Sequence, residues 1–598
     1  MAAFLIIMAS LISYSNSFQA PFIFDDLNNI LDNSSIRNIA DIRKFFLVPP
    51  VSGLWDRPVI NFTLAINYAL SGENPWSYHA MNLFIHILSA LCLFGITRRT
   101  LLTSRLTERY RHAATSLALA FALIWALHPM NTQAVTYVIQ RCESLMGLFY
   151  LLTMYCAIRS WFSTSTNTWR LLAILFLVLG IGTKEVIITA PFVVLAYEWI
   201  FLHPSFKEIW RRSRFLYLGF GLGVITLSII ALAGGTVTSV VSPLQYWQTQ
   251  PQVILHYLRL AVWPQPLCFD YGWPIASPGE AIPAIFILLI LLAGSLWLFF
   301  KKSPFAFPAI WFFAVLAPTS IVPLPDPAWD YRMYLPLASL SVIAVIGFYE
   351  LSGKLTKRFF PDRKDVLRLS RIFLLVIIAC LLGGATWLRN QTYRQEITVW
   401  QDTVIKRPQN SRAHLNLGVA LDHLGRINDA MAEYREAIRL NPRSDAAYAN
   451  LGFGLYRMGK SAEAIELLHK SILLNPENVA AHSNLGIALW GAGKKEEAYR
   501  YFKKALQLKA NQPQVHSNLG YALNEMGRYD EAISHLREAI IWNPNFAVAH
   551  ANLGYSLESK GLNSEAIAHY REALRLNPEL KELRYRLEKL IRHVEPNN

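Results

Sequence analysis

The C-terminal part of the sequence is built from one short motif that returns at a fixed interval. The tripeptide Asn-Leu-Gly recurs every 34 residues, beginning at Asn416, Asn450, Asn484, Asn518 and Asn552. An alanine follows each of these glycines twelve residues later. A constant period of this length is typical of paired helices that bury their apolar faces only by stacking on their neighbours. This part of the chain must therefore form a helical solenoid.

A 34-residue period with small residues at the helix contacts is the pattern of the tetratricopeptide repeat (TPR). We predict five repeats over residues 411–580, followed by a capping helix and tail over residues 581–598. The five asparagines would face the concave side of the solenoid, where their amides suit the backbone of a bound protein. The alternative is that these asparagines only hold neighbouring repeats together.

The N-terminal part has the composition of a membrane protein. Only 16% of the residues in the chain are charged, well below the roughly 25% of ordinary globular domains. We interpret eleven apolar runs as membrane spans. They cover about residues 2–18, 79–97, 113–128, 144–161, 170–183, 186–202, 214–233, 281–300, 305–323, 335–351 and 371–388. The sequence thus predicts an all-α protein, with a polytopic helical bundle over residues 1–390, a linker over 391–410 and then the TPR solenoid.

The basic residues of this bundle predict its orientation. Four loops are rich in Lys and Arg, including those from Arg98 to Arg111 and from Lys354 to Arg371. With eleven spans and a cytoplasmic N-terminus, all four loops are cytoplasmic, as the positive-inside rule requires. Segment 251–264 is then re-entrant or interfacial, and the TPR repeats are extracytoplasmic, either periplasmic or lumenal. We therefore attribute the net charge of +15 to topology and not to nucleic-acid binding.

Two adjacent carboxylates, Asp25 and Asp26, follow the first apolar run. Carboxylates at a membrane boundary usually face a polar cavity and serve chemistry or ion handling. A carboxylate in such a place can act as general base toward a hydroxyl group. The alternative is a solvated turn that caps the next helix, because Asp favours turns and N-caps.

Further polar and aromatic residues fall on the same predicted side of the membrane. Cations there can hold a lipid phosphate and stabilise the charge that develops on it as a leaving group. The candidates for phosphate binding are Arg57, Arg141, Lys184 and Arg332. Other possible site-lining residues are His79, His128, Glu143, Glu185, Tyr331 and Tyr334. Structural alternatives are an interfacial Arg that snorkels, a His that is only hydrogen-bonded, and a Lys184–Glu185 pair that neutralises itself.

Four short motifs resemble those of a known family. They are Phe24-Asp25-Asp26, the run from His128 to Val135 followed by Arg141-Cys142-Glu143, the pair Lys184-Glu185, and the run from Arg332 to Pro336. In this order, ahead of a TPR array, they resemble the transmembrane-and-TPR protein O-mannosyltransferases over essentially the whole chain. The resemblance implies a GT-C glycosyltransferase fold, a polyprenyl-phosphate-linked sugar as donor, and a catalytic acidic residue in the first external loop, here Asp25 or Asp26. Gln133 stands where the family has Glu.

We therefore predict an inverting glycosyltransferase that acts with a membrane lipid carrier. It would transfer a sugar, mannose in the family, to Ser or Thr of a protein acceptor that the repeats recruit. We expect a bacterial member, with undecaprenyl phosphate as the carrier. No cofactor or dedicated metal site is recognisable in the sequence, although Asp25 and Asp26 could share a divalent ion with the phosphate. The alternatives are a non-catalytic membrane-anchored TPR scaffold for envelope complexes and a lipid-carrier flippase or transporter.

Overall fold

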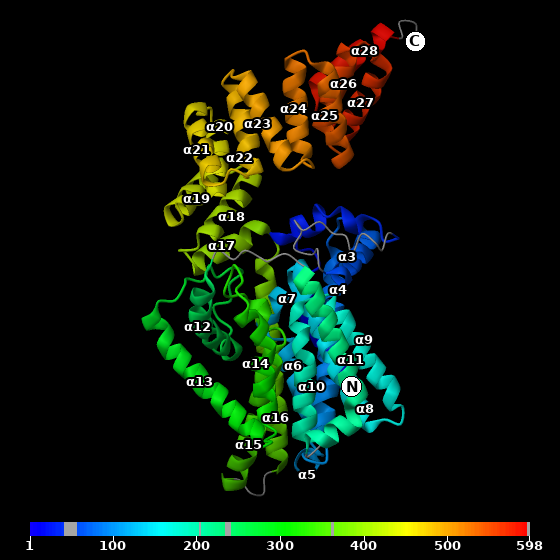
Figure 1. Cartoon of the computed structure of the whole chain (residues 1–598), viewed down its shortest axis with the longest axis vertical. Helices are drawn as coiled ribbons and strands as arrows, with labels where there is room; N and C mark the ends of the chain where they lie inside the picture. The colour runs from blue at the N-terminus through cyan, green and yellow to red at the C-terminus, as the bar shows by residue number, and fades with distance from the viewer. Residues whose placement is uncertain (41–56, 203–204, 234–240, 360–363, 595–598) are drawn as a thin grey trace. The chain divides into compact units, whose positions relative to one another are not determined.

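The computed structural model describes residues 1–40, 57–202, 205–233, 241–359 and 364–594 (Figure 1). The chain divides into two compact units, Met1–Pro408 and Gln409–Asn598. Every regular element among the described residues is a helix. The all-α fold class is therefore confirmed, with the apolar helices first in the chain and the TPR solenoid second.

The first unit contains a long series of α-helices and several single-turn helices. The α-helices are α1 (Ala2–Ser13), α3 (Pro58–Ser71), α4 (Trp76–Leu101), α5 (Thr107–Tyr110), α6 (Ala114–Ala126), α7 (Thr132–Thr136), α8 (Arg141–Phe162), α9 (Thr166–Ile181), α10 (Ala190–Phe201), α11 (Phe206–Ala233), α12 (Pro243–Val262), α13 (Pro278–Phe300), α14 (Ala306–Ile321), α15 (Pro336–Phe359), α16 (Lys364–Thr392) and α17 (Glu396–Lys406). The short turns that matter for the site are η3 (Pro129–Asn131), η4 (Val138–Gln140), η5 (Glu185–Thr189) and η6 (Asp330–Met333).

Several helices of the first unit are long and apolar enough to cross a membrane. Among the described residues five qualify, in α4, α8, α13, α15 and α16, and the pair of α6 with Pro129–Thr136, bent by 51°, makes up to six. Each of the eleven predicted runs lies on a helix, but α1 and α10 have only 12 residues each. A helix needs about 20 residues to span a bilayer. The number of spans and their orientation therefore stay predictions.

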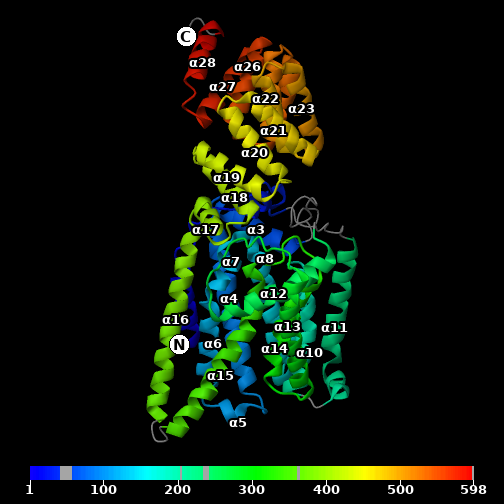
Figure 2. The same cartoon turned by 90° about the vertical axis from the view of Figure 1, so that its left-hand side faces the viewer.

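The core of the first unit forms around α4, which packs against α1, α3, α6 and α8. By contrast, α13 and α16 lie on the outside of this unit (Figures 1 and 2), and their apolar windows are only 11% and 6% buried. Exposed apolar faces of this kind suit contact with lipid. The end of α16 is nevertheless anchored, because Asn390 donates a hydrogen bond to the Ser13 carbonyl (3.2 Å) and accepts one from Thr136 (2.7 Å).

The range 391–410, predicted as a linker, contains the end of α16 and the whole of α17. Arg389 Nη1 lies 2.7 Å from Asp402 Oδ2, which joins the two helices. Lys406 donates from Nζ to the carbonyl of Leu267 at 2.8 Å. These contacts attach α17 to the first unit, which ends at Pro408.

The second unit consists of five helix pairs and a last helix. The elements are α18 (Ser411–His423), α19 (Ile427–Leu440), α20 (Asp445–Arg457), α21 (Ser461–Leu474), α22 (Val479–Gly491), α23 (Lys495–Leu508), α24 (Pro513–Glu525), α25 (Tyr529–Trp542), α26 (Ala547–Ser559), α27 (Asn563–Leu576) and α28 (Lys581–Val594). Residues 595–598 of the predicted tail lie outside the described residues.

The repeated glycines explain why the two helices of each repeat approach so closely. A Cβ atom on Gly418 would lie 2.5 Å from the ring of Tyr434, and one on Gly554 would lie 2.5 Å from the ring of Tyr570. A second glycine ends the first helix of each repeat, with φ between +73° at Gly527 and +80° at Gly459. Glycine adopts this left-handed conformation without the steric penalty of a side chain.

Candidate functional site

Asp25 and Asp26 lie in the loop after α1, and the residue before them has a strained backbone. Phe24 has a φ angle of +51°, a left-handed conformation that costs a non-glycine residue roughly 1–2 kcal/mol. Its ring makes edge-to-face contacts with Phe269 and Trp400, at centroid distances of 6.2 and 5.5 Å. Such strain persists only where the surrounding contacts impose it, and it is concentrated at functional sites. The loop is thus held in one particular conformation.

The carboxyl group of Asp26 is buried and fixed by backbone donors. Its Oδ2 accepts a hydrogen bond from the N–H of Ile23 (3.1 Å), and its Oδ1 accepts one from the N–H of Ile139 (2.8 Å). Burial raises the pKa of Asp26 to about 8, and the two backbone donors oppose this shift. Because Oδ1 links the loop to η4 and Oδ2 closes a turn within the loop itself, the geometry favours a positioning role for Asp26.

Asp25 has a fixed backbone and a half-buried side chain. Its N–H donates to the hydroxyl oxygen of Tyr137 (3.0 Å), and its carbonyl accepts from Nδ2 of Asn29 (2.8 Å). Burial raises the pKa of the Tyr331 phenol, and the charges of Glu143 and Asp25 add to this effect. Asp25 therefore belongs to the same electrostatic environment as Tyr331 and Glu143.

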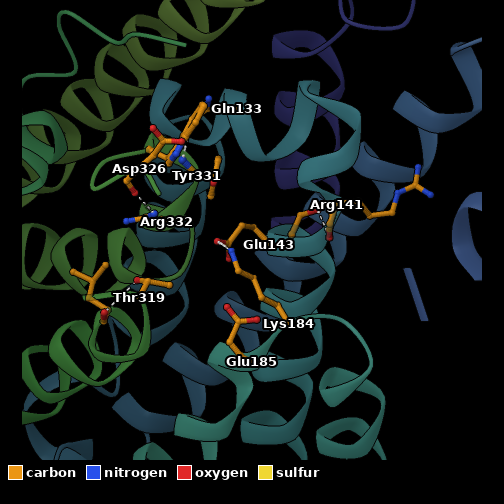
Figure 3. Close-up of polar contacts among 12 residues, drawn as sticks. Gln133, Arg141, Glu143, Lys184, Glu185, Thr319, Asp326, Tyr331 and Arg332 are labelled. Atoms are coloured by element: carbon orange, nitrogen blue, oxygen red, sulfur yellow. Dashed lines mark hydrogen bonds and ion pairs between the residues drawn. The ribbon is translucent and has the colours of Figure 1, made fainter. Parts of the chain in front are cut away.

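Lys184 and Glu143 form a buried ion pair close to Tyr331. Lys184 Nζ lies 2.5 Å from Glu143 Oε1, and the two side chains are only 10% and 4% exposed. The ammonium group also lies 5.2 Å from the centre of the Tyr331 ring. Glu185 pairs instead with Arg57, at 3.7 Å. Figure 3 shows Lys184 extending toward Glu143, with Glu185 next to it on the chain. The structure thus gives Lys184 a partner other than Glu185.

Arg332 lies on η6, close to this ion pair, but its donors contact the protein itself. Its Nη1 donates to the carbonyl of Pro327 and its Nη2 to the carbonyl of Asp326, both at 2.7 Å. Nη1 also lies 3.4 Å from the hydroxyl group of Tyr246. A small cavity is lined by Arg332, Glu143 and Thr319 together with apolar residues. Arg332 therefore shapes the site chiefly by fixing the segment that carries Tyr331.

Arg141 begins α8 and is fully buried. Its Nε donates to Oδ1 of Asn82 (2.6 Å), its Nη2 to the carbonyl of Tyr78 (3.0 Å), and its Nη1 to the hydroxyl group of Thr63 (3.3 Å). These contacts tie α8 to α3 and α4. The geometry favours a structural role for Arg141, because its guanidinium group is fully buried and three of its five N–H donors already contact the protein.

The two predicted site histidines make hydrogen bonds to the backbone. His79 Nε2 lies 2.8 Å from the carbonyl oxygen of Ala20, which joins α4 to the loop that carries Asp25. His128 Nε2 lies 3.2 Å from the carbonyl oxygen of Ala261, and its Nδ1 accepts from the N–H of Met130 (3.3 Å). Both histidines hold the backbone around the site.

Tyr334 directly follows η6 and is buried in the helical core of the first unit. Its hydroxyl group lies 3.0 Å from Nδ1 of His86, and its carbonyl accepts from Trp125 Nε1 at 2.9 Å. Gly147 allows this packing, since a Cβ there would lie 2.8 Å from the Tyr334 ring. The histidine that orients Tyr334 was missed in the sequence because an apolar helix face surrounds it.

Gln133 is a buried amide that fixes two loops at once. Its Nε2 donates to the carbonyl of Phe269 (2.8 Å), and its Oε1 accepts from the N–H of Tyr331 (3.2 Å). Figure 3 places Gln133 directly beside Tyr331. A glutamate here would lack the donor that Phe269 uses, so Gln133 suits this particular pair of loops. Tyr137, which receives the Asp25 N–H, carried no recognisable signal in the sequence.

The adjacent carboxylates Asp25 and Asp26 do not form a ready-made metal site. Within the described residues no three His, Cys, Asp or Glu side chains are grouped as ligands. Each oxygen of Asp26 already accepts one backbone N–H group, so an ion shared with Asp25 would have to use a remaining lone pair of this buried carboxyl group. The described residues thus offer two carboxyl groups, without a third protein ligand, to an ion that is bound together with the phosphate.

The five repeated asparagines of the second unit, Asn416, Asn450, Asn484, Asn518 and Asn552, occupy equivalent half-buried positions. Asn518 Oδ1 accepts from Gln514 (3.2 Å), whereas its Nδ2 has no hydrogen-bond partner. The carbonyl of Asn552 accepts from Asn524 (3.0 Å) of the preceding repeat. Both of the predicted roles, partner binding and contact between repeats, are compatible with these positions.

The first comparisons with known proteins concern the TPR repeats of the second unit. Models of the tetratricopeptide repeat match residues 423–459, 451–513, 489–554 and 547–580. Solved structures that resemble the chain include YrrB, a TPR protein with an unusual peptide-binding site. YrrB is 21% identical with a TM-score of 0.26, and the match covers 32% of this chain and 97% of YrrB. Another is a thermophilic TPR protein of Thermus thermophilus, with 24% identity and a TM-score of 0.27 over 30% and 98%. By its own helices and by the TPR models, the chain joins helices that are apolar enough to cross a membrane to a TPR array.

Three curated relatives extend the similarity into the membrane unit. Protein O-mannosyl-transferase F38B6.6 of Caenorhabditis elegans is 24% identical over 73% of this chain and 62% of its own length. Protein O-mannosyl-transferase TMTC1 of Homo sapiens is 26% identical over 73% of this chain and 55% of its own length. TMTC4 of Mus musculus is 26% identical over 71% of this chain and 64% of its own length. The chain is therefore a homologue of these protein O-mannosyl-transferases, and the resemblance seen in the sequence is confirmed. It spans less than two thirds of the length of these relatives.

Proposed function

We propose that this chain is a glycosyltransferase that moves mannose from a polyprenyl phosphate to a Ser or Thr hydroxyl group of a protein. The similarity to protein O-mannosyl-transferases over about 70% of the chain supports this function. The single structural observation that carries it is the environment of Tyr331, whose phenol feels the charge of Asp25 on the strained loop and whose ring lies 5.2 Å from the buried Lys184 ammonium group.

The chemical step assigns different roles to the two adjacent carboxylates. Asp25 accepts the proton of the acceptor hydroxyl group as its oxygen forms a bond to the anomeric carbon. The bond between that carbon and the phosphate oxygen breaks from the opposite face, so the configuration inverts and the lipid phosphate leaves with the electron pair. Asp26 positions the loop through its two backbone hydrogen bonds.

Lys184 and Arg57 are the cations that we assign to the lipid phosphate. Each is paired with a carboxylate, Lys184 with Glu143 and Arg57 with Glu185. A phosphate that enters between these pairs gains two cationic partners, and the charge that develops on leaving is stabilised. Arg141 and Arg332, whose donors already contact the protein, act as positioning residues.

The repeats complete the proposed function by recruiting the protein acceptor. A TPR solenoid offers a continuous concave surface, which is its usual binding face. For this role the repeats must lie on the same side of the membrane as Asp25, with the N-terminus in the cytoplasm. The positive-inside pattern of the basic loops supports this orientation.

The test uses the full chain in nanodiscs with polyprenyl-phosphate mannose and an extract of exported proteins. We expect mass spectrometry to find mannosylated peptides, and Asp25→Asn to abolish transfer. Asp32→Asn is the matched control, because it makes the same change on an exposed residue of the same segment. Wild-type transfer rates in Asp25→Asn would refute the assignment of the base. A chain that captures proteins through its repeats but transfers no sugar from any donor would instead be a scaffold.

A further inference from the structure

The same position of the first helix is a histidine in four of the five repeats. Each of these histidines faces a residue nineteen positions later, on the second helix of its own repeat. The pairs are His414 with Glu433, His482 with Tyr501, His516 with His535, and His550 with His569. Repeats four and five therefore each place two imidazole rings next to each other, tilted by 38° and 33°, between the two helices of the repeat.

The two histidine pairs have the same geometry. The Nδ1 atoms are 3.1 Å apart in the pair of His516 and His535, and 3.0 Å apart in the pair of His550 and His569. The ring centroids are 5.2 Å apart in both pairs. The residue on the first helix is buried and its partner on the second helix is half-buried. Each pair is thus fixed on one side and accessible from solvent on the other.

A backbone carbonyl settles which nitrogen of the buried ring carries a proton. His516 Nε2 lies 2.9 Å from the carbonyl oxygen of Ala510, and His550 Nε2 lies 3.0 Å from that of Pro544. Because a carbonyl only accepts, each Nε2 must carry the hydrogen. In the neutral ring the Nδ1 lone pair then points toward the partner ring. Metal-bound histidines are held in the same way, with the second nitrogen donating to a carbonyl.

We propose that each of these histidine pairs binds one divalent transition-metal ion through its two Nδ1 atoms. Imidazole nitrogen suits Cu²⁺, Zn²⁺ and Ni²⁺. With metal–nitrogen bonds of about 2.0–2.1 Å, two adjacent ligand atoms lie about 2.9 Å apart at a right angle and about 3.3 Å apart at a tetrahedral angle. The distances of 3.1 and 3.0 Å fall within this range. Without metal the same distances fit an Nδ1–H···Nδ1 hydrogen bond, so the half-buried ring must carry its proton on Nε2 when the ion binds.

The rest of the coordination sphere consists of water. No third His, Cys, Asp or Glu ligand is in place within the part of the chain that the structure describes. Glu531, Glu538 and Lys503 contribute charge around His535, while Glu565, Glu572 and Arg537 contribute charge around His569. Each site is therefore open and exchangeable, and the bound ion clamps the two helices of its repeat.

Repeat three supplies a natural control for this proposal. It keeps the buried His482, whose Nε2 lies 2.9 Å from the carbonyl oxygen of Pro476, but faces it with Tyr501. The His482 and Tyr501 rings stack, with centroids 5.8 Å apart. The substitutions His535→Tyr and His569→Tyr therefore reproduce a pairing that this fold already accommodates.

The test titrates Cu²⁺ into the full chain in nanodiscs, purified without a histidine tag and stripped by a chelator. We expect equilibrium dialysis to show one bound Cu²⁺ fewer in each single Tyr variant, and two fewer in the double variant. The paramagnetic resonance spectrum of the wild type should show two imidazole nitrogens on each of these ions. Without metal, the variants should keep the circular dichroism and thermal midpoint of the wild type.

An unchanged number of bound ions in a folded double variant would overturn the proposal. So would a wild-type spectrum with a single imidazole nitrogen per ion. His516→Gln and His550→Gln provide a second route, since they remove the buried ligand and leave the half-buried one. A folded double Gln variant that binds as many ions as the wild type would overturn it as well. The outcome is independent of mannose transfer.

Discussion

Replacing the Asp26 carboxylate by an amide should destabilise the membrane unit without any change in shape. In the wild type the two oxygens accept the N–H groups of Ile23 and Ile139. The oxygen of Asn can serve only one of them, so one backbone N–H and the new amide group lose their partners in a buried place. Each unsatisfied buried donor costs about 1–3 kcal/mol, which gives a total of about 2–6 kcal/mol for Asp26→Asn.

This prediction is checked by thermal unfolding of the full chain in detergent, followed by tryptophan fluorescence. Asp26→Asn should lower the midpoint clearly, whereas the exposed Asp32→Asn should leave it unchanged. Hydrogen exchange adds a local readout, because the amides of Ile23 and Ile139 should lose protection first. An Asp26→Asn variant with the midpoint and exchange of the wild type would refute the positioning role that we assign to this carboxyl group.

Three further predictions follow from buried groups. The pKa of Asp26 is about 8 in the folded chain and near 4 in the unfolded chain. The contribution of Asp26 to the free energy of unfolding should therefore fall as the pH rises from about 4 to 8. Asp26→Asn should remove this dependence when melting is measured at several pH values. Glu143→Gln leaves the buried Lys184 without its anion, so we expect a loss of about 3–5 kcal/mol in denaturation and slower mannose transfer. Gly147→Ala places a Cβ 2.8 Å from the ring of Tyr334, and the resulting overpacking of about 1–3 kcal/mol should lower the melting midpoint. A wild-type midpoint would contradict the ion-pair argument for Glu143→Gln and the packing argument for Gly147→Ala.

The solenoid was predictable because its signal is local and repeated. Asn-Leu-Gly returns at a constant interval, and the glycines meet large side chains across each repeat, as Gly418 meets Tyr434. The apolar runs likewise locate helices, since hydropathy reflects a property of one segment. The apolar runs do not determine the number of spans. Short apolar helices such as α10 pack against other helices inside the unit, and they give the same hydropathy signal as a span.

The residue types of the candidate site were predictable from the sequence, but the contacts between these residues were not. Lys184 and Glu143 are 41 residues apart in the chain, and Lys184 pairs with Glu143 because α8 and η5 meet in space. The different roles of Asp25 and Asp26 depend on where the backbone donors of η4 lie, which no local pattern reports. Phe24 gave no sign of its positive φ, since phenylalanine rarely adopts it.

The contact between Phe24 and Trp400 has a practical consequence for dissecting the protein. Trp400 belongs to α17, ten residues beyond the predicted end of the bundle at residue 390, yet its ring lies against both Phe24 and Phe269. A fragment cut at residue 390 would lose this aromatic wall, and the acidic loop would relax toward ordinary backbone angles. A fragment that ends at Pro408 retains the wall, so the smallest piece worth isolating for chemistry includes the helix that sequence analysis assigned to a linker.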